Sequence, residues 1–147
     1  MTEYSQVQSS GSLALDDEIL YTDEDSYRLA LSVARAAEDR KGGDIVLLRV
    51  SEISYLADYF AIVTGYSKVQ VRAISDAIID QAETECQRQP QRVEGEYNGT
   101  WLVQDYGDVI VHILMPQERE YYNLEAFWGH GENIDLEAET SGERSRR

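Results

Sequence analysis

The chain is poor in cysteine, in basic residues and in long apolar runs. Its single cysteine, Cys86, excludes an internal disulfide and a multi-cysteine metal site. No run of about 18 or more apolar residues occurs, so no segment is predicted to span a membrane. The first residues lack the basic and apolar regions of a secretory signal, and they are not rich in arginine as transit peptides are. We therefore expect a cytoplasmic protein that does not enter the membrane.

The scarcity of basic residues gives the chain a strong negative charge. Its 147 residues include 28 Asp and Glu against 13 Lys and Arg, so the formal charge is −15. Affinity for nucleic acids comes mostly from Lys and Arg that replace counterions on phosphates, and an anionic membrane surface repels an acidic protein. The composition therefore argues against a DNA- or RNA-binding protein, and it favours a basic protein as the partner.

The acidic residues are unevenly spread, which predicts one domain between two tails. Residues 1–25 carry seven acids and no Lys or Arg, and we predict an acidic mobile tail there. Residues 131–147 hold five acids, three arginines and no aromatic residue, and we predict a flexible C-terminal tail. The folded unit is then predicted over residues 26–130, which carry 16 acids and 10 bases.

Helical and strand patterns alternate within this unit. Apolar residues at helical spacing follow Asp25 or Ser26, either of which suits the N-cap. The predicted order is a helix from there to Gly42, buried strands at 44–50 and 58–64, a helix from Ser67, an edge strand at Val93, a hairpin, and a helix from Pro116 through Tyr121, Leu124 and Trp128. We therefore predict an α/β fold, a mixed sheet with helices packed on it.

The clearest local signal is a hairpin whose turn holds Tyr106 and a glycine. Apolar runs flank this pair, and the glycine suits the positive φ that a tight turn needs. A two-residue loop would pair Asp105 with Asp108. Counting outward from that pair places Trp101 opposite His112.

The aromatic residues are mostly Tyr and Trp, with 10 Tyr and 2 Trp against 2 Phe. Both types suit protein interfaces, because each side chain combines a large apolar ring with one polar group that can form a hydrogen bond. On the hairpin, Trp101, Val103 and Asp105 share one strand face, and the acid beside the tryptophan predicts a partly exposed face. Two interpretations stay open for the hairpin aromatics, an interface or the core, and we favour the interface.

The helix after the hairpin carries further aromatic residues. Tyr121 and Trp128 share a helical stripe with Leu124, and core packing explains both. Tyr122 lies outside that stripe. The predicted partner-binding residues are Trp101, Val103, Asp105, Tyr106, Asp108, His112 and Tyr122.

No group of catalytic residues stands out. Two-metal phosphoryl transfer needs paired carboxylates such as Asp-x-Asp on one strand face, and no predicted strand carries that motif. Asp105 and Asp108 flank a tight turn, where aspartate is favoured for backbone reasons. His112 has no evident nucleophile beside it. We therefore predict no catalytic, metal or cofactor site, and a divergent nucleotidyltransferase is the weakest alternative.

Several separated segments resemble the ribosomal silencing factor family, which includes Iojap-like proteins. In order they are Asp58 to Gly65, Ala73-Ile74, Glu94-Gly95, Trp101, Asp105 to His112, and Arg119 to Trp128. The resemblance covers roughly residues 27–128. It implies a small α/β domain that is related to nucleotidyltransferases but lacks their catalytic motif. It also implies a homodimer in many members.

The same resemblance implies a partner and a function. Family members are expected to bind large ribosomal subunit protein fourteen at the intersubunit face. That binding blocks joining of the small subunit and lowers translation when nutrients are scarce. An acidic chain would be repelled by ribosomal RNA, so Asp105 and Asp108 are expected to meet Lys or Arg of the basic protein. An adaptor for large-subunit assembly that uses the same surface stays an alternative.

Overall fold

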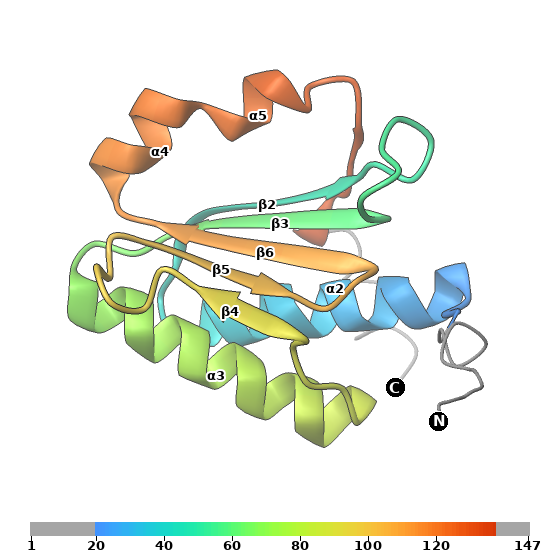
Figure 1. Ribbon diagram of the computed structural model, residues 1–147, viewed down its shortest axis with the longest axis horizontal. Helices are drawn as coiled ribbons and strands as arrows, with labels where there is room; N and C mark the ends of the chain where they lie inside the picture. Colours follow the sequence, from blue (N-terminus) through green and yellow to red (C-terminus); the bar gives the residue numbers. More distant parts are fainter. Residues whose placement is uncertain (1–19, 138–147) are drawn as a thin grey trace, which may run out of the picture.

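The fold is a six-stranded mixed sheet with helices on both faces (Figure 1). The computed structural model describes residues 20–137, so the parts of the predicted tails at 1–19 and 138–147 lie outside the described residues. The elements are α2 (Asp23–Asp39), β2 (Gly43–Arg49), β3 (Tyr59–Thr64), α3 (Lys68–Cys86), β4 (Arg92–Glu94), β5 (Trp101–Asp105), β6 (Val109–Leu114), α4 (Pro116–Tyr122), α5 (Leu124–Phe127) and β7 (Glu132–Asn133).

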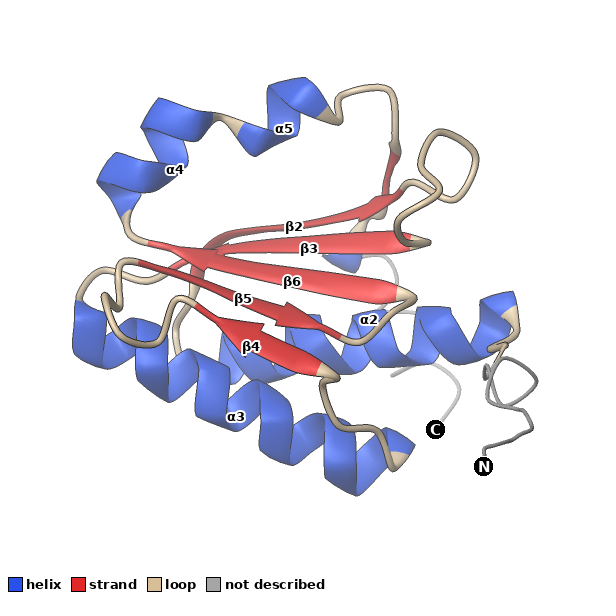
Figure 2. Cartoon of the chain, in the orientation of Figure 1, coloured by secondary structure: helices blue, strands red, loops and turns tan. Residues whose placement is uncertain are grey.

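The strands lie in the order β4-β5-β6-β3-β2-β7. The β3–β6 pair is parallel, and the other pairs of the described sheet are antiparallel. Figure 2 shows the long helices α2 and α3 on one face of the sheet and the short helices α4 and α5 on the other. The predicted mixed α/β fold is thus confirmed, including the short edge strand at Val93.

The folded part begins before residue 26 and continues beyond residue 130. Thr22 caps α2, because its hydroxyl accepts a hydrogen bond from the Asp25 amide at 3.0 Å and the Asp25 carboxylate accepts one from the Thr22 amide at 3.3 Å. The cap therefore lies earlier than the predicted Asp25 or Ser26. At the other end, β7 pairs with β2, and both predicted domain boundaries lie inside the fold.

The face under α2 and α3 is closed, and we call it the helix-covered face. Its core consists mostly of fully buried aliphatic side chains from both helices and from the strands, among them Leu29, Val33, Ile74, Ile78 and Ile113. Removing each such side chain from water contributes about 1.5–3 kcal/mol to folding. This face therefore supplies most of the apolar burial in the described chain.

The opposite face has a smaller core and a partial cover. Leu48, Phe60, Ile62 and Leu114 are buried there, and Trp101, Leu124 and Trp128 pack against them while staying partly exposed. Neither α4 nor α5 contains a buried residue. We call this side of the sheet, together with α4 and α5, the aromatic face.

The predicted hairpin forms, but with a different register. Asp105 pairs with Ile110 and Trp101 pairs with Leu114, so the placement of Trp101 opposite His112 is wrong. The turn is shifted by one residue along the chain, because the Tyr106 amide donates to the Val109 carbonyl at 2.9 Å and leaves Gly107 and Asp108, in place of Tyr106 and Gly107, between the paired residues. Gly107 adopts the expected positive φ, at 92°.

The predicted helix from Pro116 through Trp128 is two helices. Asn123 has a left-handed backbone with φ 47° and separates α4 from α5. The change of direction breaks the expected stripe of Tyr121, Leu124 and Trp128. Tyr121 is 80% exposed, so the prediction that it packs in the core is wrong.

Candidate functional site: the aromatic face

Seven aromatic rings form an unbroken series of contacts across the aromatic face. The series starts on α4, crosses β5, β6 and β3, and ends at α5 and the residue that follows it. Its centroid distances are 4.9 Å for Tyr121–Tyr122, 4.6 Å for Tyr122–Trp101, 6.0 Å for Trp101–His112, 6.0 Å for His112–Phe60, 4.7 Å for Phe60–Trp128 and 5.2 Å for Trp128–Phe127. Each contact lies in the range typical of aromatic pairs.

Exposure along this series rises toward both ends. Phe60 in the middle is 3% exposed, and Trp101, His112 and Trp128 are half-buried. Tyr121 and Phe127 at the ends are 80% and 75% exposed. Exposed apolar patches with a buried centre mark interaction surfaces rather than cores. The series is therefore anchored in the sheet and open to solvent at its ends.

A hydrogen bond within the series fixes the orientation of Trp101. The indole Nε1–H donates to His112 Nδ1 at 3.1 Å, so Nδ1 is an acceptor and the imidazole is neutral. Burial lowers the pKa of His112 to about 4, in agreement with that geometry. At neutral pH the pair is therefore an uncharged, oriented unit.

Five of the seven predicted binding residues lie on the aromatic face. Trp101, Val103 and Asp105 are half-buried on one face of β5, whereas Leu102 and Gln104 between them are buried. The predicted partly exposed face is thus confirmed. The other two members are His112 and Tyr122, which lie in the ring series described above.

Tyr106 does not belong to this surface. Its ring is 1% exposed, and its hydroxyl donates to Gln104 Oε1 at 2.8 Å. Burial raises the pKa of Tyr106, as expected for a phenol held in the core. The expectation that Tyr106 anchors a partner is corrected, because Tyr106 continues the alternation of β5 on the buried side of Leu102 and Gln104.

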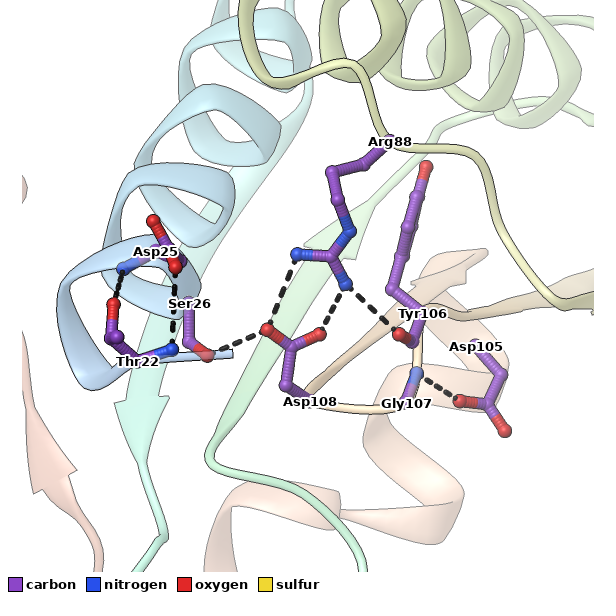
Figure 3. Close-up of polar contacts among 8 residues, drawn as sticks. All are labelled: Thr22, Asp25, Ser26, Arg88, Asp105, Tyr106, Gly107 and Asp108. Carbon is purple, nitrogen blue, oxygen red and sulfur yellow. Dashed lines mark hydrogen bonds and ion pairs between the residues drawn. The ribbon is translucent and has the colours of Figure 1, made fainter. Parts of the chain in front are cut away.

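Asp108 is also engaged within the protein (Figure 3). Its carboxylate accepts from Arg88 Nη2 at 2.6 Å and from the Ser26 hydroxyl at 2.6 Å, and the side chains of Asp108 and Arg88 are each 9% exposed. Arg88 also donates to the Tyr106 carbonyl at 3.1 Å. The expectation that Asp108 meets a partner's cation is corrected, because this acid joins α2, the end of α3 and the hairpin turn.

Asp105 has a mixed role. One carboxylate oxygen accepts from the Gly107 amide at 2.8 Å, which builds the turn, as Figure 3 shows. The other oxygen accepts from Arg92 Nη2 at 3.2 Å on the edge strand β4. Because Arg92 is exposed, this ion pair is weak, and a partner's cation can compete for Asp105.

The acidic residues of the described chain offer no evident catalytic arrangement. The one Asp-x-Asp of the sequence, Asp23 and Asp25, lies in the first turn of α2, where Asp25 completes the cap and Asp23 pairs with Arg49 at 3.1 Å. Among residues 20–137 no group of three or more His, Cys, Asp and Glu side chains is placed to hold a metal ion. The helices of the same part include none long and apolar enough to cross a membrane.

The sequence did not predict that Tyr121, Phe60, Trp128 and Phe127 join the ring series. Helical spacing predicts core positions for Tyr121 and Trp128, which is wrong for the exposed Tyr121 but holds for the half-buried Trp128, which packs against Phe60. The sequence patterns do not single out Phe60 or Phe127. A signal for Phe60 exists in the strand pattern, because the parallel β3–β6 pair places it beside Ile110 and on the face of His112. Which face of β3 is only partly covered depends on how α4 and α5 are placed. The break at Asn123 sets that placement, and the helical spacing did not predict it.

The fold and this surface define a small mixed α/β protein with an aromatic face and no evident catalytic centre among the described residues. Residues 23–147 match the family described as "Ribosomal silencing factor during starvation". The chain therefore belongs to the ribosomal silencing factor family.

Individual relatives agree with this assignment. The chain is 43% identical over 104 residues to the ribosomal silencing factor RsfS of Bacillus subtilis, and this match covers 71% of this chain and 87% of that protein. It is 36% identical over 119 residues to the chloroplastic protein Iojap of Zea mays, covering 80% of this chain and 51% of that longer protein. A crystal structure of a protein from Chromobacterium violaceum is similar with a TM-score of 0.65 and 34% identity, over 74% of this chain and 88% of that one.

Proposed function

We propose that this protein silences ribosomes by docking its aromatic face on large ribosomal subunit protein fourteen. Docking there blocks joining of the small subunit and represses translation when nutrients are scarce. The observation that carries the proposal is the ring series from Tyr121 to Phe127, which is exposed at its ends and fixed in the sheet at its centre. Oriented aromatic anchors of this kind dominate the free energy of protein interfaces.

The charge of the surface supports a basic protein partner. The helices α4 and α5 contain three acids, Glu118, Glu120 and Glu125, and a single base, Arg119. Arg119 is bound to Glu125 within the protein, so the charge that these helices present is negative. An acidic rim around aromatic anchors steers a Lys- and Arg-rich surface toward the site and repels RNA.

Subunit-joining experiments test this function. Purified protein is added to separated ribosomal subunits, and sucrose gradients report where it sediments and how many whole ribosomes form. We expect it to sediment with the large subunit and to reduce whole ribosomes. Association that leaves joining intact would favour the assembly adaptor instead, and failure to sediment with the large subunit would reject both functions.

A matched pair of tyrosine substitutions localises the contact. Tyr121→Ala removes an exposed end of the ring series, whereas Tyr55→Ala removes a fully exposed tyrosine of the β2–β3 loop outside it. We expect binding to weaken by about fivefold or more for Tyr121→Ala and to stay unchanged for Tyr55→Ala. The reverse result would place the contact on the β2–β3 loop.

Self-association and compartment are part of the same proposal. We propose that the protein forms a homodimer and acts in the cytoplasm, where ribosomes are assembled and used. Size-exclusion chromatography with light scattering distinguishes a single chain of 16.7 kDa from a dimer of twice that mass.

A further inference from the structure

The helices α4 and α5 carry the exposed ends of the ring series, yet neither helix has a buried residue of its own. Figure 1 shows them on the side of the sheet away from α2 and α3, reached from the end of β6. Leu124 and Trp128 provide apolar contacts with the sheet. Short helices without a buried face are not held rigidly by their own propensity, so a further contact must fix their position.

Arg119 provides that contact. Its side chain is 10% exposed, and it lies on α4 between the sheet and α5. Nη1 donates to Thr64 Oγ1 at 2.8 Å, and Nη2 donates to the Asp44 carbonyl at 2.7 Å. Nε and Nη2 donate to the two carboxylate oxygens of Glu125 at 3.0 and 2.7 Å. One guanidinium thus ties α4 to β3, β2 and α5.

The backbone on both sides is shaped to receive this guanidinium. Gly43 pairs with Thr64 and Val46 pairs with Ile62, so β2 contains one extra residue between these pairs. Asp44 lies in this bulge with φ 44°, a backbone conformation that residues other than glycine rarely adopt. The Asp44 carbonyl is the one that Arg119 binds. Asn123, also left-handed, turns the chain so that Glu125 faces Arg119.

We propose that Arg119 is a positioning residue for partner binding, which holds the two short helices so that their aromatic side chains are oriented before the ribosome is met. This inference rests on the proposed function. Arg119 itself need not touch the partner, because four of its five N–H donors are bound within the protein. Its effect reaches the partner through Tyr122, whose ring packs on Trp101 at 4.6 Å, and through Trp128, which packs on Phe60 at 4.7 Å.

The ion pair between Arg119 and Glu125 is bidentate, which is a strong and directional geometry. An arginine that binds both oxygens of one carboxylate is directional as well as charged, and lysine cannot reproduce the fork. The hydrogen bonds from Arg119 lower the pKa of Glu125, so the carboxylate remains ionised and paired through the neutral range. Preorganisation of this type improves affinity by reducing what must be ordered on binding.

The test uses the two tryptophans of the chain, Trp101 and Trp128, both of which belong to the ring series. Tryptophan fluorescence, excited at wavelengths that the ten tyrosines do not absorb, therefore reports on the aromatic face alone. The variants are Arg119→Lys and Arg119→Ala, and the control is Arg72→Ala, which removes the same charge from an exposed position on α3. Acrylamide quenching is measured on each free protein, and co-sedimentation with the large subunit gives the affinity.

We expect both Arg119 variants to show stronger quenching and about tenfold weaker binding, with a circular dichroism spectrum close to the parent protein. The control is expected to match the parent in both measurements. Weaker binding with unchanged quenching would overturn the positioning role and make Arg119 a direct contact. Unchanged binding and unchanged quenching would overturn the inference altogether.

Two further outcomes keep the inference separate from the proposed function. If the parent protein does not bind the large subunit, the proposed function fails, whereas the quenching comparison still reports whether Arg119 orders the aromatic face. If Arg119→Ala does not fold, Glu125→Gln removes the charge of the pair and keeps an amide that can accept a hydrogen bond. It is then expected to give smaller changes of the same sign, and no change in quenching would overturn the inference.

Discussion

The two faces of the sheet are built on different principles. The helix-covered face lies under helices of 17 and 19 residues and is filled with fully buried aliphatic side chains. The aromatic face lies under helices of 7 and 4 residues and is lined by rings whose exposure rises toward the edges. Complete burial favours stability, whereas a partly covered face keeps apolar side chains available to a partner. The comparison predicts that stability and binding can be changed separately.

The sharpest contrast is expected from one truncation on each face. Ile78→Ala on α3 empties a fully buried site of the helix-covered face. We expect it to lower the free energy of unfolding by about 2–5 kcal/mol. Binding to the large subunit is expected to stay normal at temperatures where the variant is folded. Urea unfolding measures the first quantity and co-sedimentation the second, and a large loss of affinity in the folded variant would contradict the separation.

Trp101→Ala makes the corresponding change on the aromatic face. An aromatic anchor typically contributes about 2 kcal/mol or more to binding, which corresponds to roughly a thirtyfold loss of affinity. Because Trp101 is half-buried and hydrogen-bonded to His112, some stability is lost too, but the variant is expected to fold. A melt by circular dichroism accompanies the binding measurement. A collapsed melt, or unchanged binding, would assign Trp101 to the core.

These contrasts show what the sequence could and could not predict. Alternation along Trp101 to Asp105 predicted the open strand face, because side-chain period is a local property. The prediction of the hairpin register was wrong by contrast, because an Asx turn at Asp105 and the inward Tyr106, which pairs with Val109, move the turn one residue along the chain. The break at Asn123 was not predicted for a related reason. It is stabilised by the Arg119–Glu125 pair, and the bonds that Arg119 makes to Thr64 and Asp44 in the sheet lie outside any local window.

A pH titration provides a medium-sized test of the Trp101–His112 pair. The folded pKa of His112 is lowered to about 4 from 6.5, so the unfolded chain binds a proton in this interval and the folded protein does not. Its contribution to stability is therefore fully present above pH 6.5 and is lost as pH falls toward 4, by up to about 1.4 kcal/mol for each pH unit.

Denaturant unfolding at several pH values measures this slope. His112→Gln is expected to flatten it, and the same substitution at the exposed His130 serves as the control. An equal slope in the His112 variant and in the parent protein would mean that the imidazole is not held neutral by burial.

The smallest effects are expected from shortening the N-terminus, and they separate the tail from the fold. Removing residues 1–19 should move the thermal midpoint hardly at all, since that segment carries only like charges and no periodic apolar face. Removing residues 1–25 deletes the Thr22 cap and should cost about 1 kcal/mol or more. Equal midpoints for the two truncations would show that the cap does not matter, and a fall of many degrees for the shorter one would place residues 1–19 in the fold.

The parallel pairing at the centre of the sheet has a consequence for folding during synthesis. Residue 59 of β3 pairs with residue 109 of β6, and α3, β4 and β5 lie between them in the chain. Until β6 leaves the ribosome, β3 has β2 on one side and an open edge on the other, although all six of its residues are buried in the finished sheet. Such an edge pairs readily with other chains. The nascent protein is therefore most prone to aggregation shortly before its own aromatic face is complete.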